Sequence, residues 1–247
     1  MHRKFLVSLL CFFLGANAVF ATAFDDANQQ FKVGDFAGAA TAYEICLTAE
    51  GPRAAVYYNL GNSYQSLKQY GPAILAYERA RLLTPRDPDL LANLALARKA
   101  ATAFETTSGN PRLEAALNYL SRNEWSWLVA GAGLFLGVLV MVGGAVPLPP
   151  RARLMLVVFS GVAGLAMVAG ATALYQRRGE GGRGIVLSEN ATVRLSPFEK
   201  AESLGTAGHG RTVHLGSETG DFRYVEIPGT QLRGWLAVKD VEAIVGR

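Results

Sequence analysis

The side chains of this sequence whose type and spacing indicate a chemical role are the amides of four asparagines. Asn28 and Asn62 are separated by the same interval as Asn59 and Asn93. A carboxamide carries both hydrogen-bond donors and an acceptor, but it is neither a nucleophile nor a general base. The asparagines therefore indicate a binding role. The secondary-structure elements that carry them must repeat with the same period.

No other group of residues resembles a catalytic centre. The sequence has no nucleophile beside a base, no metal-ligand spacing and no glycine-rich phosphate loop between a strand and a helix. Cys11 lies in an apolar N-terminal run, which leaves Cys46 alone and excludes an intramolecular disulfide or a cysteine metal cluster. We therefore expect a protein that is not an enzyme and that carries no cofactor and no metal.

The interval between the asparagines recurs well beyond them, and it is the period of a tetratricopeptide repeat, about 34 residues. The segment from Ala54 to Pro85 resembles such a repeat, which is a pair of antiparallel helices. Its signature positions are Tyr57, Leu60, Gly61, Tyr64, Ala73, Tyr77, Ala80 and Pro85. An earlier copy lacks the closing proline, and a third copy begins at Pro88 and fades after Phe104, as a capping helix would. We predict an all-α tetratricopeptide-repeat solenoid over residues 24–120, with about two repeats and a cap.

The tetratricopeptide resemblance also implies a ligand. In peptide-binding members of the family, amides on the first helix of each repeat hold the main chain of an extended peptide on the concave face. The residues at those positions, or on the same face, are Asn28, Tyr58, Asn59, Asn62, Gln65 and Asn93. A purely structural role for these asparagines is the alternative. The basic residues that clamp a terminal carboxylate in some relatives are missing here.

The N-terminus has the layout of a secretory signal peptide. Two basic residues precede an apolar run over residues 5–14, and small residues follow up to Ala23. We expect residues 1–23 to be removed by cleavage after Ala23; cleavage after Ala18 and an uncleaved anchor are the alternatives. In each case the chain from residue 25 onward crosses the membrane.

Two uncharged segments, residues 125–146 and 154–175, each have the length of a membrane span. A helix rises about 1.5 Å per residue, so about 20 residues cross the hydrocarbon core of a bilayer. We predict a two-helix transmembrane hairpin in contact with lipid. Small residues repeat at intervals of four, and they give the predicted helix-packing positions Gly133, Gly137, Ser160, Gly164 and Gly170.

The leader and the even number of spans predict a multi-pass protein of the cytoplasmic membrane with both soluble regions on the periplasmic or outer side. Arg151 and Arg153 in the hairpin loop agree with this orientation, whereas Arg177 and Arg178 after the second span oppose it. No ionisable residue lies at membrane depth, which argues against a channel or a pump.

Short β segments divided by turns follow a linker of glycine and charged residues over residues 176–184. Their order resembles the bacterial SH3-like family, and Arg194, Gly234 and Trp235 match its recurrent positions. The resemblance predicts an all-β SH3-like small barrel of about five strands over residues 185–247. Tyr224 and Trp235 are the expected aromatics of its groove or core.

Charge excludes one class of partner. Without Arg3 and Lys4 of the leader, the chain has 22 basic residues against 20 acidic ones. A nucleic-acid-binding protein needs a concentrated basic face. We therefore expect no nucleic acid among the ligands.

The order of leader, repeats, two spans and SH3-like tail resembles the BatE-type proteins of the bacterial Bat (aerotolerance) gene clusters. The resemblance covers the whole chain and depends on architecture. It implies a non-enzymatic scaffold or adaptor of the cell envelope that works with membrane-anchored von Willebrand factor A-type proteins and a MoxR-type ATPase. The alternative is a cell-wall sensor or anchor whose tail binds peptidoglycan and whose repeats recruit a wall hydrolase.

Overall fold

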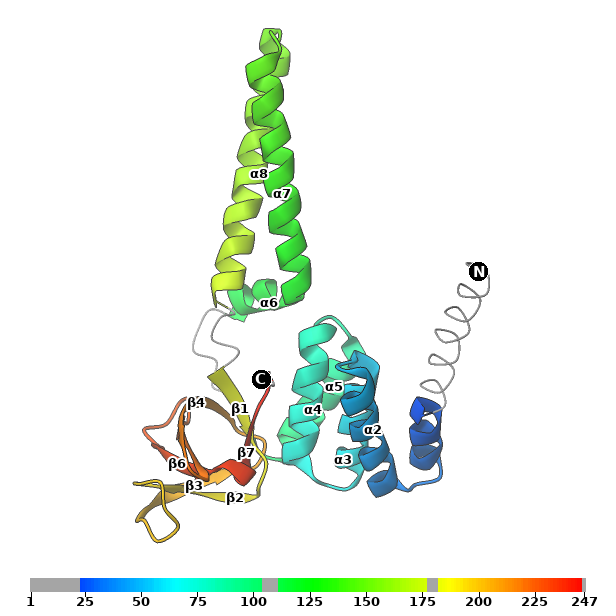
Figure 1. Ribbon diagram of the computed structural model, residues 1–247, viewed down its shortest axis with the longest axis vertical. Helices are drawn as coiled ribbons and strands as arrows, with labels where there is room; N and C mark the ends of the chain where they lie inside the picture. The colour runs from blue at the N-terminus through cyan, green and yellow to red at the C-terminus, as the bar shows by residue number, and fades with distance from the viewer. Residues whose placement is uncertain (1–22, 104–110, 177–181, 246–247) are drawn as a thin grey trace, which may run out of the picture. The chain divides into compact units, whose positions relative to one another are not determined.

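The computed structural model describes residues 23–103, 111–176 and 182–245, which form two compact units (Figure 1). One unit contains the helical repeats together with a C-terminal β-sheet. The other unit is a helical hairpin that lies between these two parts in the sequence. Apart from Ala23, the leader predicted at residues 1–23 lies outside the described residues.

The repeat region is entirely helical. A helix over residues 23–32 is followed by α2 (Phe36–Glu50), α3 (Ala54–Ser66), α4 (Tyr70–Leu83) and α5 (Pro88–Ala100). The Asp35 and Asp87 side chains accept hydrogen bonds from the first turns of α2 and α5, and proline opens α5, so local sequence sets both starts. The described part of this region therefore consists of two helix pairs followed by α5.

Small and aromatic residues bring the two helices of each repeat together. Ala39 and Tyr43 in the first repeat, like Ala73 and Tyr77 in the second, are almost completely buried. A Cβ on Gly61 of α3 would lie 2.5 Å from the Tyr77 ring, so only glycine allows this close approach. The sequence period therefore reflects the side-chain packing between the two helices of each repeat.

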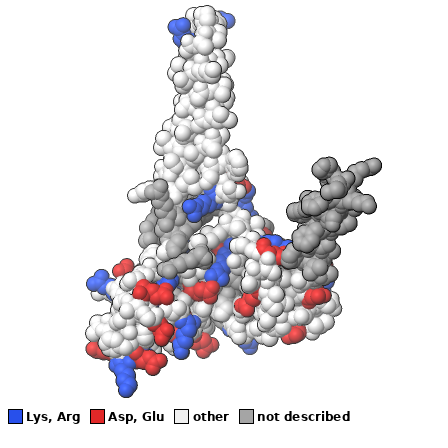
Figure 2. Space-filling model, in the orientation of Figure 1, with Lys and Arg blue, Asp and Glu red and all other residues white. Residues whose placement is uncertain are grey.

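The hairpin consists of α6 (Pro111–Tyr119), α7 (Arg122–Ala145) and α8 (Pro150–Gln176). Both long helices are apolar enough to cross a membrane, and Figure 2 shows an uncharged surface along them with basic side chains where they are joined. They begin before the predicted spans at residues 125 and 154, because a capping box of Ser121 and Glu124 starts α7 and Pro150 starts α8. The sequence pattern did not predict α6.

The C-terminal region forms one antiparallel sheet with the strand order β3-β2-β6-β5-β4-β1-β7. Its strands are β1 (Arg183–Val186), β2 (Asn190–Arg194), β3 (Ser203–Gly208), β4 (Thr212–Thr219), β5 (Phe222–Glu226), β6 (Arg233–Ala237) and β7 (Val241–Ala243). Val193 of β2, Val213 of β4 and Val225 of β5 are fully buried and belong to the hydrophobic core of the sheet.

The sheet differs from the predicted five-stranded barrel in two respects. It has seven strands, because β1 begins inside the predicted linker and β3 carries two glycines that hide its alternating pattern. In the described residues the ladder does not close either, since β3 and β7 pair on one side only. The observed element is therefore an antiparallel sheet with two edges.

Candidate functional site

Asn28 is the centre of a hydrogen-bonded group in the first repeat. The hydroxyl of Tyr43 donates to Asn28 Oδ1 over 2.7 Å, and Asn59 Nδ2 donates to the same oxygen over 2.9 Å. The three side chains come from the first described helix, α2 and α3. The group therefore ties the first repeat to the second.

The same group recurs one period later. The hydroxyl of Tyr77 donates to Asn62 Oδ1 over 2.7 Å, and Asn93 Nδ2 donates to that oxygen over 3.0 Å. Tyr77 Oη also lies 3.2 Å from Gln65 Oε1, and Asn93 Nδ2 donates to Tyr58 Oη over 3.0 Å. All six residues predicted to bind peptide thus take part in these two groups.

The two tyrosines fix the orientation of the amides. Burial raises the pKa of Tyr43 and of Tyr77, so both hydroxyls remain protonated donors at neutral pH. A hydroxyl donor and an amide donor both point at Oδ1 of Asn28 and of Asn62, which leaves the Nδ2 group of each amide facing away. Among the described residues, no group bonds to these two Nδ2 atoms or to Oδ1 of Asn59 and Asn93. Each group therefore keeps one amide nitrogen and one amide oxygen that no described residue uses.

A cavity opens beside the first group. Its volume is about 240 Å³, and its lining residues are Asn28, Phe31, Lys32, Tyr43 and Asn59. Phe31 is half-buried and Lys32 is exposed, so the cavity combines an aromatic wall, two amides and a cation. A short stretch of peptide main chain fits this chemistry, because its carbonyl and amide groups need one donor and one acceptor.

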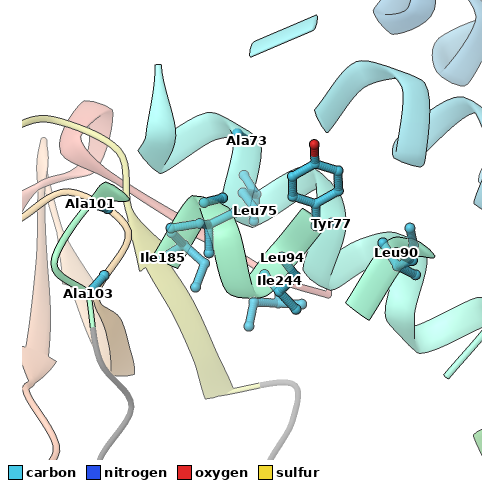
Figure 3. Close-up of a cluster of buried hydrophobic side chains, with 12 residues drawn as sticks. Ala73, Leu75, Tyr77, Leu90, Leu94, Ala101, Ala103, Ile185 and Ile244 are labelled. Atoms are coloured by element: carbon cyan, nitrogen blue, oxygen red, sulfur yellow. The ribbon is translucent and has the colours of Figure 1, made fainter. Parts of the chain in front are cut away.

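Within the same unit, α4 packs against the sheet, and we call this contact the repeat–sheet interface. Ile185 of β1 and Ile244, which follows β7, are buried in one cluster with side chains of α4 and α5 (Figure 3). A Cβ on Gly71 would lie 2.8 Å from Leu187 Cα, so the backbone of α4 is in direct contact with the chain that follows β1. No feature of the sequence pattern predicted this interface.

Arg79 crosses the repeat–sheet interface from α4. Its guanidinium donates to the Glu242 carboxylate over 2.6 Å and to the carbonyl oxygens of Ala243 and Ile244 over 2.8 and 3.1 Å. These carbonyls belong to the edge of the sheet at β7, which is thereby covered. The equivalent residue of the first repeat is Ile45, which is 61% exposed and has no sheet against it.

Glu78 is a fully buried carboxylate between α4 and α5. Arg81 donates to one of its oxygens over 3.0 and 2.6 Å, and Arg98 donates to the other over 2.5 Å. Burial would raise the pKa of Glu78, but the guanidinium groups of Arg81 and Arg98 hold that pKa below its ordinary value. The ionised carboxylate thus fixes α5 to the second repeat.

The hairpin holds the predicted packing residues Gly133, Gly137, Ser160, Gly164 and Gly170. A Cβ on Gly170 would lie 2.5 Å from Val129 of α7, and one on Gly133 would touch α8, so these two glycines lie between the helices. A Cβ on Gly137 or Gly164 would meet no described residue within 4 Å, and Ser160 is half-buried. The structure therefore brings two of the five positions into the contact within the hairpin.

Tyr224 and Trp235 face each other on the neighbouring strands β5 and β6. Their ring centroids are 5.5 Å apart in an edge-to-face arrangement, and both side chains are half-buried. Such a cross-strand aromatic pair stabilises a sheet and leaves part of each ring accessible. No cluster of three metal-ligating side chains occurs in the part of the chain that the structure describes.

Comparison with known proteins identifies one region. Residues 54–87 match the family described as tetratricopeptide repeat, and they contain both α3 and α4. No curated protein matches the chain. Residues 54–87 therefore form a tetratricopeptide-type repeat, a structure that typically serves as a scaffold for protein–protein interaction.

Proposed function

We propose that this chain is a non-enzymatic, membrane-anchored scaffold that holds an extended segment of a partner protein on the amide-bearing face of its repeats. The observation that carries the proposal is the recurrence of the asparagine–tyrosine group with the period of the helices. Each group uses one amide oxygen internally and leaves a donor and an acceptor for a ligand backbone. The two apolar helices supply the anchor.

The internal hydrogen bonds also show how to test the proposal cleanly. Replacing Asn62 with alanine would remove the shorter of the two hydrogen bonds of the Tyr77 hydroxyl, and also the acceptor of Asn93, and so disturb the fold. Asn28→Asp with Asn62→Asp keeps both Oδ1 acceptors and replaces the outward donors with oxygen atoms. Because each lost hydrogen bond leaves a ligand carbonyl unsatisfied, affinity should fall by about 1–3 kcal/mol per site.

The experiment compares the full chain with this double variant in crosslinking and recovery of partners from membranes. Asn190→Asp, an exposed change on the sheet, is the matched control and should leave partner recovery unchanged. Both variants should keep the thermal stability of the wild type. If the double variant recovered its partners as well as the wild type does, the asparagines would serve only as scaffold residues.

The order of segments supports a more specific proposal. The chain would act at the cytoplasmic membrane in a Bat-type assembly, with the sheet as an SH3-like module and with both soluble regions on the outer side. Its partners would be membrane-anchored von Willebrand factor A-type proteins and a MoxR-type ATPase. Their recovery in the same crosslinking experiment would support this role, whereas recovery of peptidoglycan or a wall hydrolase would favour a cell-wall sensor.

A further inference from the structure

A second cavity lies between α2, α3 and α4, and none of the residues proposed to bind peptide backbone lines it. Its volume is about 330 Å³. Leu60, Leu75 and Ala76 are buried and form an apolar floor, while the rings of Tyr57 and Tyr64 form walls. Ligand pockets for whole small molecules range from roughly 300 to 1,000 Å³, so this one suits a single long side chain. We call it the Glu44 pocket, after the carboxylate at its rim.

The charges around the Glu44 pocket do not balance. Glu242 is paired with Arg79, whose Nε and Nη2 also donate to the carbonyl oxygens of Ile244 and Ala243. Glu44 accepts a hydrogen bond from the hydroxyl of Tyr64, but among the described residues no basic side chain pairs with it. Burial raises the pKa of Tyr64, and the neighbouring Glu44 raises it further, so the tyrosine remains a neutral donor. One uncompensated negative charge therefore stands beside an apolar floor.

The next repeat shows what fits such a carboxylate. Glu44 and Glu78 occupy the same position in successive repeats. Glu78 is neutralised by Arg81 and Arg98. The equivalents of these two arginines beside Glu44 are Leu47 and Tyr64, and both line the pocket without supplying a cation. The Glu44 pocket therefore corresponds in position to the ion cluster around Glu78, but it has no arginine at the positions equivalent to Arg81 and Arg98.

We infer that the Glu44 pocket takes an arginine side chain from a partner protein. The aliphatic stem would cover Leu60 and Ala76, and the guanidinium would pair with Glu44, as Arg98 does with Glu78. A ligand without charge would bury the Glu44 carboxylate uncompensated, and an anionic ligand would be repelled. Leu187 and Glu242 close one end, so the sheet completes the pocket.

The test uses two labelled, end-blocked heptapeptides that differ only in a central arginine or citrulline, which has nearly the same shape without the charge. Their binding to the full chain in detergent is measured by fluorescence polarisation. The arginine peptide should bind about ten-fold more tightly, because hydrogen bonds to charged groups are the stronger ones. Equal binding of the two peptides, or no binding of either, would overturn the inference.

Two variants locate the effect. Glu44→Gln keeps an acceptor for Tyr64 and removes the charge, so the preference for arginine should disappear. Leu47→Arg copies Arg81 into the first repeat and should block the arginine peptide by filling the pocket from within. Glu202→Gln, an exposed change on the sheet, is the control and should keep the preference. A preference that survived Glu44→Gln would show that the peptide binds elsewhere.

The Asn28→Asp, Asn62→Asp double variant distinguishes the Glu44 pocket from the amide-bearing face that is proposed to bind the partner segment. Neither Asn28 nor Asn62 lines the Glu44 pocket, so the double variant should keep the arginine preference even when it loses its partners. Conversely, suppose that the arginine peptide binds no better than the citrulline peptide while partner recovery still depends on the asparagines. That result would overturn the inference about the Glu44 pocket and leave the proposed function standing. If the double variant lost the preference for arginine, the peptide would bind at the amide-bearing face, and the inference that the Glu44 pocket is a separate site would be wrong.

Discussion

Replacing Gly71 with alanine tests whether the repeat–sheet interface is a fixed part of the fold. Alanine is favoured over glycine by up to about 1 kcal/mol in a helix, so without a close neighbour this first-turn position of α4 would be unchanged or stabilised. At Gly71, however, the new Cβ would lie within 3.0 Å of three backbone atoms of Leu187, which no side-chain rotation can relieve. The first repeat has the exposed Ala37 at this position, where no sheet covers the helix.

The two effects can be weighed against each other. Overpacking in a close-packed region costs about 1–3 kcal/mol, and separating the surfaces by about half an ångström also sacrifices part of their dispersion energy. After subtraction of the gain in helix propensity, the interface should lose about 1 kcal/mol, or roughly a five-fold increase in local opening. Ala37→Gly, the reverse change in the uncovered repeat, should instead show the plain loss of helix propensity.

Amide hydrogen exchange on the full chain in detergent provides the local measurement. Exchange in β1 should accelerate about five-fold in Gly71→Ala, whereas Ala37→Gly should leave β1 unchanged and accelerate exchange in α2. If Gly71→Ala slowed exchange in both α4 and β1, as a simple gain in helix propensity would, the close contact with Leu187 would not exist in solution.

Glu78→Gln should lower the free energy of unfolding by about 3 kcal/mol, because Arg81 and Arg98 lose their buried partner; urea titration measures this. Since the folded-state pKa of Glu78 is lowered, its contribution is present above the ordinary value of 4.5 and is lost as the pH falls through the lower folded value. The gap between wild type and Glu78→Gln should therefore narrow in acid. Gly170→Leu should separate α7 from α8 in spin-label distance measurements, while Gly137→Leu, which faces no neighbour among the described residues, should not. Alkaline phosphatase fused after residue 101 or at the C-terminus should be active in both cases. The repeat–sheet interface requires the same side of the membrane for both regions, and the predicted leader places that side outside. One active and one inactive fusion would contradict the interface, and two inactive fusions would contradict the orientation.

The sequence predicted the repeats because their packing is periodic. Gly61, Ala73 and Tyr77 must recur wherever two helices of this type approach, so the period itself predicted α3 and α4. It also predicted that the asparagines share one face. It did not predict the hydrogen bonds from Tyr43 and Tyr77. An aromatic residue at a signature position is expected to pack, and the repeat period does not show whether its hydroxyl also makes a hydrogen bond.

The repeat–sheet interface could not be predicted in the same way. Ile185 and Ile244 have the apolar character of any strand residue, and nothing in a strand pattern tells which surface covers it. The signal was in the differences between the copies. Where the first repeat has Ala37 and Ile45, the second has Gly71 and Arg79, and both changes serve the contact with the sheet. Similarity between repeats identified the helices, whereas their differences marked the surface that binds the sheet.

The repeat–sheet interface has a consequence for biogenesis. Ala103 and Ile185 belong to the same buried cluster, yet the whole hairpin is synthesised between them. At about 5–20 residues per second, β1 would leave the ribosome roughly 4–16 s after α5. During that interval Ile74 and Leu75 of the nascent repeats would not yet be covered by the sheet. A chain truncated after Gln176 would keep its two apolar helices and its asparagines but leave this surface open. It should therefore bind an apolar dye and a holdase chaperone that do not bind the complete chain.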